Sequence, residues 1–240
     1  MPSDAFAAAS QLEGVPSAFA ATRDGIDSLL RDRGLRRSDP QTTAESLLRG
    51  ASATAALEGS AYETDVLRDG GGDATALAAV RLSTELLGLV PVWERAPLQA
   101  LARIHALLGA GRVDAADLGR PVNADGARRL HVLAQQVVTR TDAPGLVVAA
   151  LVHAEIATAE AFCSDNAMIA RAAERLVLVA RGVDPASVTV PESGHAQTPN
   201  AYLEARAAYA QGAAAGTQQW LLYAAQALAR GAEVTPMTRR

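Results

Sequence analysis

The segment from residue 147 to 152 reads Val-Val-Ala-Ala-Leu-Val and is apolar on nearly every side of the helix that it predicts. A helix without a polar face lies at the centre of a bundle, because no side of it is suited to contact with water. Elsewhere the apolar residues are chiefly Ala, Leu and Val, and aromatic residues make up only 4% of the chain. Helices with such small side chains can approach closely, so the sequence predicts an all-α fold, a helical bundle.

Breaks in the helical pattern divide the chain of 240 residues into an N-terminal arm (1–14), N-terminal helices (15–60), a core (61–231) and a tail (232–240). The second N-terminal helix is expected to begin with Asp39 as its cap and Pro40 in its first turn, and to end at Gly59. Residues 112–123 are punctuated by Gly and Pro, which suits a loop or a small β-hairpin.

Charge and cysteine usage exclude several classes of function. The net charge is -4 and no basic cluster occurs, which argues against nucleic acid as a partner. All cations are Arg, so neither Schiff-base chemistry nor a phosphate-binding loop with its Lys is available. The single cysteine, Cys163, forms no internal disulfide, and no Cys/His cluster has the spacing of a metal site. We expect a cytoplasmic protein without a leader, a membrane span or a bound metal.

A stretch of 19 residues, from His153 to Arg171, carries the most specific pattern in the chain. It resembles the active-site motif of the Fic (Fido) family, in which a helix runs into His-Pro-Phe, an acidic residue, Gly-Asn-Gly, an Arg and a second Arg. Phe162, Asn166 and Arg171 match the Phe, the Asn and the second Arg of that motif. The other positions differ: the catalytic His is Glu160, the metal-binding acid is Ser164, the two glycines are Asp165 and Ala167, and the first Arg is Met168.

A second pattern upstream strengthens this resemblance. Thr54, Glu58 and Gly59 fit the inhibitory helix of the same family, which has Ser or Thr, three residues, Glu, and then Gly or Asn. The resemblance covers about residues 15 to 230 and implies a Fic-like bundle with a peptide-binding flap near 112–123. It also implies that Glu58 and Arg171 meet as an inhibitory salt bridge. Without the resemblance, they would be two unrelated surface charges.

The altered motif lacks most of the chemistry of a working member. There, the His is the general base, the acid binds Mg²⁺, and the glycine turn exposes N–H groups to the phosphates. An exposed carboxylate at Glu160 accepts a hydroxyl proton poorly at neutral pH, and loss of a general base typically costs ~10²–10⁴ in rate. Ser164, Asp165 and Asn166 are typical of a helix cap, and these side chains are expected to occupy the phosphate site. Cys163 is expected to be buried.

Three hypotheses remain open. The first is a degenerate Fic-fold protein without ordinary adenylyl transfer, a pseudoenzyme that acts by binding or regulation with a protein partner. The second is a transferase of a nucleotide or another phosphate-linked group onto protein hydroxyls, using ATP with Mg²⁺, Glu160 as base and Glu58 as gate. The third is an Ala-rich bundle for assembly as a homodimer, which would be supported if Thr54 to Gly59 lay far from Asn166. His153 is expected to be a packed histidine, and the other three histidines show no partner spacing.

Overall fold

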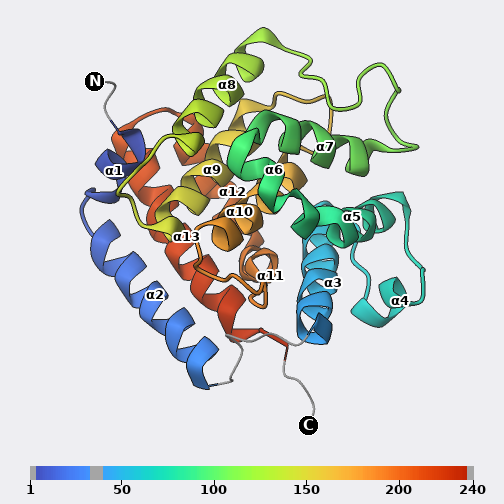
Figure 1. Cartoon of the computed structure of the whole chain (residues 1–240), viewed down its shortest axis with the longest axis horizontal. Coiled ribbons are helices and arrows are strands. Elements are labelled where there is room, and N and C mark those ends of the chain that lie inside the picture. The colour runs from blue at the N-terminus through green and yellow to red at the C-terminus, as the bar shows by residue number, and fades with distance from the viewer. Residues whose placement is uncertain (1–3, 33–39, 237–240) are drawn as a thin grey trace.

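The computed structural model describes residues 4–32 and 40–236. Within these ranges the chain is helical and contains no strand, as predicted for an all-α fold (Figure 1). The longer helices are α2 (Val15–Asp32), α3 (Pro40–Leu57), α5 (Ala74–Glu85), α7 (Pro97–Gly109), α8 (Ala124–Val138), α9 (Gly145–Ala159), α10 (Asn166–Ala180), α12 (Pro199–Ala210) and α13 (Ala214–Glu233). Shorter elements are α1 (Ala5–Ser10), α4 (Thr64–Arg68), the 3₁₀ turn η1 (Leu86–Leu89), α6 (Val90–Arg95) and α11 (Pro191–Ala196).

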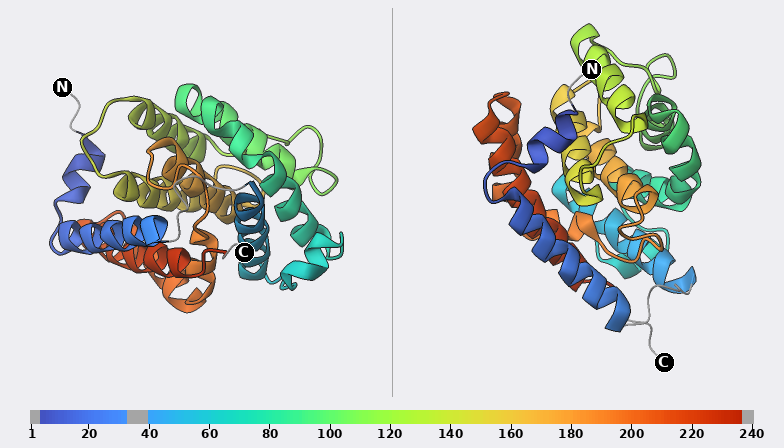
Figure 2. Two further views of the ribbon diagram at one scale, coloured as in Figure 1. Left: turned by 60° about the horizontal axis from the view of Figure 1, so that its bottom comes forward. Right: turned by 60° about the vertical axis from the view of Figure 1, so that its left-hand side comes forward.

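Helices α9 and α10 form the centre of the bundle and pack on each other (Figure 1). Twelve of the fifteen α9 residues are buried, as the apolar segment 147–152 predicted. Around this pair, α8 covers α9, α7 packs against α5, and α3 lies between α5 and α11. On the other side α2 runs along α13, an arrangement that both views of Figure 2 show. The two helices that carry the motif are therefore held from all sides.

The expected N-terminal arm is not a loose segment over its described part. Residues 5–10 form α1, whose first turn is capped by the carboxylate of Asp4, which accepts from Ala7 N at 3.0 Å. Phe6 is buried against the core and Val15 is fully buried. Short segments carry little helical periodicity, so the arm prediction was wrong here. The predicted cap Asp39 lies outside the described residues, while α3 begins at Pro40 as expected.

Of the two structures expected for residues 112–123, the loop is present and the small β-hairpin is not. The segment consists of successive turns, with Asp117 N donating to Asp114 O and Arg120 N donating to Asp117 O. Gly119, at φ +72°, donates its N–H to Nδ1 of His105 at 2.9 Å, so this amide is not available for a strand ladder. Val122 N donates to Ala161 O at 2.7 Å, which fastens the end of the loop to the motif loop.

Among the described residues, one helical run has the length and the apolar composition that a membrane-spanning helix requires. Residues 74–95, which comprise α5, η1 and α6, are long and apolar enough to span a membrane, although no such segment was expected. A core helix passes the same test, and here the run packs against α3 and α7. Arg81 on α5 donates to the carbonyl of Leu107 at 2.8 Å at the end of α7. The apolar composition of this run is therefore weak evidence of a membrane span.

Candidate functional site

The altered motif begins where α9 ends. Glu160 follows the last residue of α9 in the left-handed conformation (φ 45°, ψ 42°), which is uncommon for a residue other than Gly. Its carbonyl accepts from Nδ2 of Asn123 at 2.7 Å, which fixes this turn. The Glu160 side chain is exposed, and within the described part of the chain its carboxylate takes no hydrogen bond. Glu160 thus occupies the turn into the motif loop, and no hydrogen bond from residues 4–32 or 40–236 orients its carboxylate as a base.

The motif loop is closed by Asn166. Its Oδ1 accepts from Phe162 N at 3.0 Å, and its Nδ2 donates to Phe162 O at 2.8 Å, so both polar atoms of the amide are bound to one residue. Phe162 is buried, as expected, and its ring lies 4.7 Å from the ring of His105. Cys163, the next residue after Phe162, is exposed, which contradicts the expectation that it is buried. The Asn166 amide is therefore engaged on both its oxygen and its nitrogen by the backbone of the motif loop.

Asp165 brings a carboxylate to the start of α10. Its side chain is only 7% exposed and is held by Arg112, whose Nη1 and Nη2 both donate to Oδ1 at 3.2 Å. The Ser164 hydroxyl donates to Oδ2 at 2.7 Å. The prediction that the Asp165 side chain caps α10 is wrong. Asp165 adopts the left-handed conformation (φ 60°), and its side chain accepts no N–H of α10. The carboxylate nevertheless supplies negative charge at a helix N-terminus, where such charge is favourable.

Arg171, in the second turn of α10, meets the upstream pattern. Its side chain is 1% exposed, and its Nη2 forms an ion pair with Oε1 of Glu58 at 2.5 Å. Nε also donates to Oγ1 of Thr54, and Nη1 donates to the hydroxyl of Tyr202 at 3.3 Å. Burial disfavours the guanidinium charge, but Tyr202 and Glu58 outweigh it and raise the pKa of Arg171 above its ordinary value. The expected Glu58–Arg171 contact is therefore present, across 113 positions of sequence.

Gly59 positions Glu58 by ending α3. Ser60 N donates to Ala55 O at 2.9 Å and Gly59 N donates to Ala56 O at 3.0 Å, the pattern of a Schellman cap. Gly59 has φ +82°, which only Gly adopts without strain. Glu58 is thus the last residue before the chain turns, with a side chain 32% exposed. The Glu-Gly order in the sequence pattern therefore has a geometric reason.

A hollow of about 250 Å³ borders this ion pair. Glu58, Tyr202 and Arg206 contribute polar atoms to it, and Leu203 and Pro199 contribute apolar ones. Leu203 is 56% exposed, which is high for a large apolar side chain. Arg206 lies over the ring of Tyr202, with Cζ 5.3 Å from the ring centroid. The hollow has room for a side chain or a small ligand next to Glu58.

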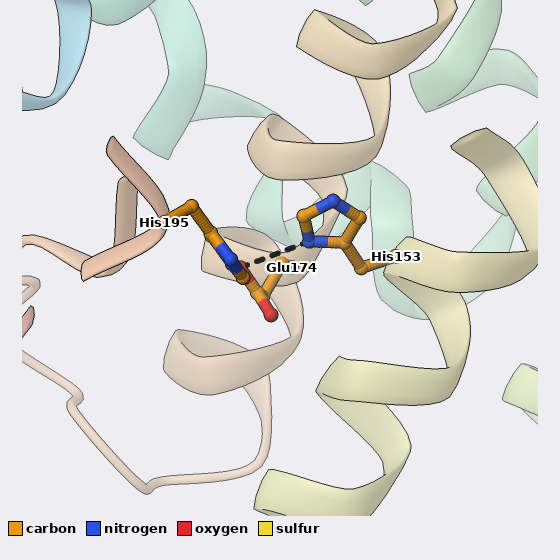
Figure 3. Close-up of side chains that lie close together, drawn as sticks. All are labelled: His153, Glu174 and His195. Atoms are coloured by element: carbon orange, nitrogen blue, oxygen red, sulfur yellow. Dashed lines mark hydrogen bonds and ion pairs between the residues drawn. The ribbon is translucent and has the colours of Figure 1, made fainter. Parts of the chain in front are cut away.

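Sequence reasoning missed a buried polar cluster directly behind Arg171. His153 of α9, Glu174 of α10 and His195 of α11 converge there, and all three side chains are fully buried (Figure 3). The His153 prediction of a packed histidine agrees with its burial. The signal in the sequence was a His directly after the apolar segment 147–152, and no local spacing connects it to partners on two other helices. Similarly missed was Arg175, buried and paired with Glu192 at 2.6 Å.

Comparison with known proteins identifies the fold. No family sequence model matches the chain, and no curated protein matches it in sequence. Solved structures do match. A Fic family protein from Desulfovibrio desulfuricans G20 has a TM-score of 0.71 at 18% identity, covering 89% of this chain and 73% of that one. Fic-1 from C. elegans has a TM-score of 0.62 at 14% identity, covering 90% and 70%. The chain therefore has the fold of Fic family proteins, as the two sequence patterns implied.

Proposed function

We propose that the chain is a Fic-fold pseudoenzyme, a binding or regulatory protein that does not carry out ordinary adenylyl transfer. One observation carries this proposal: the side chains of the motif loop are bound to the protein itself. Asn166 closes on Phe162, and Asp165 is held by Arg112 and Ser164. Such a loop holds a carboxylate, already paired with Arg112, where a working member presents N–H groups to a phosphate, so the position of the phosphate is occupied by the chain itself.

The residues at the positions of the catalytic base and the metal ligand also support this proposal. Glu160 is an exposed carboxylate without an orienting partner, whereas a general base is held by a neighbour within hydrogen-bond reach of the proton it takes. Ser164 offers a hydroxyl, already bound to Asp165, at the position of the metal-binding acid. A hard cation such as Mg²⁺ prefers carboxylate oxygens, and a hydroxyl is a weak substitute. Base and metal ligand are thus both absent from their positions in the motif.

The contact between Glu58 and Arg171 favours one alternative function. An inhibitory glutamate has a purpose only if the site it closes can open, so a working transferase with Glu58 as its gate would also retain this pair. In that case ATP with Mg²⁺ would be the donor, Glu160 the base and a protein hydroxyl the acceptor. The third hypothesis, an assembly bundle unrelated to the motif, is not favoured, because Thr54 and Glu58 contact the motif helix.

The test is incubation of the protein with Mg²⁺ and ATP labelled on its α-phosphate, alone and with a mixture of acceptor proteins. The wild type and Glu58→Gly are compared, since the variant lacks the proposed gate. We expect neither to label itself or any acceptor above a reaction without protein. Magnesium-dependent label on either would refute the pseudoenzyme proposal, and label only with Glu58→Gly would establish the gated transferase.

A further inference from the structure

The fully buried cluster of His153, Glu174 and His195 lies at the junction of three helices (Figure 3). Oε2 of Glu174 is 2.9 Å from Nε2 of His195 and 3.2 Å from Nδ1 of His153. One ligand atom from each residue can be chosen so that all three lie within 4.8 Å of one another. Ligand atoms at such separations can share one ion at bond lengths of roughly 2.0–2.2 Å after small side-chain shifts.

Two polar atoms of this cluster have no hydrogen-bond partner in the described part of the chain, Nδ1 of His153 and Oε1 of Glu174. A buried polar atom without a partner costs free energy, so each one requires an explanation. Although Nδ1 of His153 is near Oε2 of Glu174, the geometry of the pair is not that of a hydrogen bond. A proton on Nδ1 therefore does not bridge the two groups well, whereas a cation between them would satisfy both atoms.

The outer nitrogen of each imidazole is already held by a tyrosine. Nε2 of His153 lies 2.9 Å from the hydroxyl of Tyr202, and Nδ1 of His195 lies 3.0 Å from the hydroxyl of Tyr223. Metal-binding histidines commonly have their second nitrogen hydrogen-bonded in this way, which fixes the ring and the tautomer. Both rings thus direct their remaining nitrogen to the same carboxylate.

The charges around the cluster are compatible with a dication. The nearest arginines on α10 are Arg171 and Arg175, and each is paired with a carboxylate of its own, Glu58 and Glu192. This leaves Glu174 to balance an added cation.

From this geometry we infer that His153, Glu174 and His195 form a buried structural site for a divalent transition metal, with Zn²⁺ as the best fit. Two imidazoles and a carboxylate are a known Zn²⁺ ligand set, whereas Mg²⁺ and Ca²⁺ prefer oxygen ligands alone. The free Oε1 of Glu174 can add a second bond from the same carboxylate. The ion would tie α9, α10 and α11 together behind the motif helix. It would also help to fix the position of Arg171, since the Tyr202 hydroxyl is hydrogen-bonded to both His153 and Arg171.

The test is metal binding by the untagged full chain. Because the site is fully buried, the protein is unfolded with a chelator, refolded with Zn²⁺ or Co²⁺, desalted and assayed by mass spectrometry for metal per chain. We expect about one Zn²⁺ per chain and the visible absorption of protein-bound Co²⁺. The melting temperature should rise on the order of 5–10 °C at free Zn²⁺ near 100 times Kd.

Variants separate this site from surface binding. Glu174→Gln keeps the shape but removes the charge, and it should lower the bound metal to near zero. His131→Gln is the matched control, because His131 is exposed on α8 and contacts only Gln135 among the described residues. It should bind as the wild type does. A refolded wild type without metal, or Glu174→Gln with undiminished metal, would overturn the inference. If Glu174→Gln does not fold, the wild-type metal content and Co²⁺ spectrum alone decide the question.

Discussion

The replacement Glu58→Gln tests whether Arg171 depends on its ion-pair partner. Breaking a fully buried pair costs about 3–5 kcal/mol, because one charge stays buried without compensation. Glu58 is 32% exposed, and Arg171 keeps Thr54 and Tyr202 as acceptors, so the loss should be smaller. A hydrogen bond to a charged group contributes about 1.5–3 kcal/mol, and Gln retains part of it. We therefore expect the free energy of unfolding to fall by about 1–2 kcal/mol.

The assay is urea and thermal unfolding followed by far-ultraviolet circular dichroism. For a chain of this size, a loss of about 1–2 kcal/mol lowers the melting temperature by about 2–8 °C. Glu63→Gln is the matched control, since Glu63 is exposed and its side chain makes no cap hydrogen bond; its change should stay within about 0.5 kcal/mol. A double-mutant cycle with Arg171→Gln isolates the coupling. If Glu58→Gln were no more destabilising than Glu63→Gln, the reasoning about this pair would be refuted.

Three further predictions concern other parts of the fold. Glu192→Ala leaves Arg175 buried without its carboxylate, so unfolding in urea should show a loss of about 3–5 kcal/mol; a loss under 1 kcal/mol would contradict the buried pair. Gly59→Ala should lower the free energy of unfolding by about 1 kcal/mol, because φ of Gly59 is +82°. Gly25→Ala in the helix α2, where an added Cβ meets no described atom within 4 Å, should raise it by about 0.5–1 kcal/mol. Equal effects of the two variants would argue against the Gly59 cap. Burial lowers the pKa of His105, as it does that of His153, so the unfolded chain takes these protons at higher pH and stability should fall as pH drops below about 6.5. His105→Asn should remove the share of this fall that comes from His105, and a pH profile identical to that of the wild type would refute the contribution of His105.

The central helix and the long-range ion pair could be predicted from sequence for different reasons. Residues 147–152 of the helix α9 are apolar on nearly every side, and burial of such a segment follows from its composition. The contact between Glu58 and Arg171 could not be derived from spacing, since 113 positions separate the two residues. It came from the resemblance of two patterns to one family.

The missed elements depend on tertiary contacts that leave little trace in local sequence. Helix α11 has only six residues, and it is held because Gly194 fits against the Ala227 carbonyl of α13, where an added Cβ would lie 1.9 Å from the oxygen. The cluster of His153, Glu174 and His195 takes one residue from each of three helices, so no helical period connects them. Gly and Pro punctuation left a loop and a small hairpin both open at residues 112–123, because turns and hairpins share it, and the structure has the loop.

The most direct test of the central claim is calorimetric titration of ATP with Mg²⁺ into the wild type and into folded Glu58→Gly. The claim is that the motif loop binds its own side chains, through Asn166 on Phe162 and Asp165 on Arg112, so removing Glu58 alone does not open an anion site. The prediction is no saturable heat with either protein. Saturable binding that appears or strengthens in Glu58→Gly would contradict it, because the phosphate site would then be intact behind a working gate.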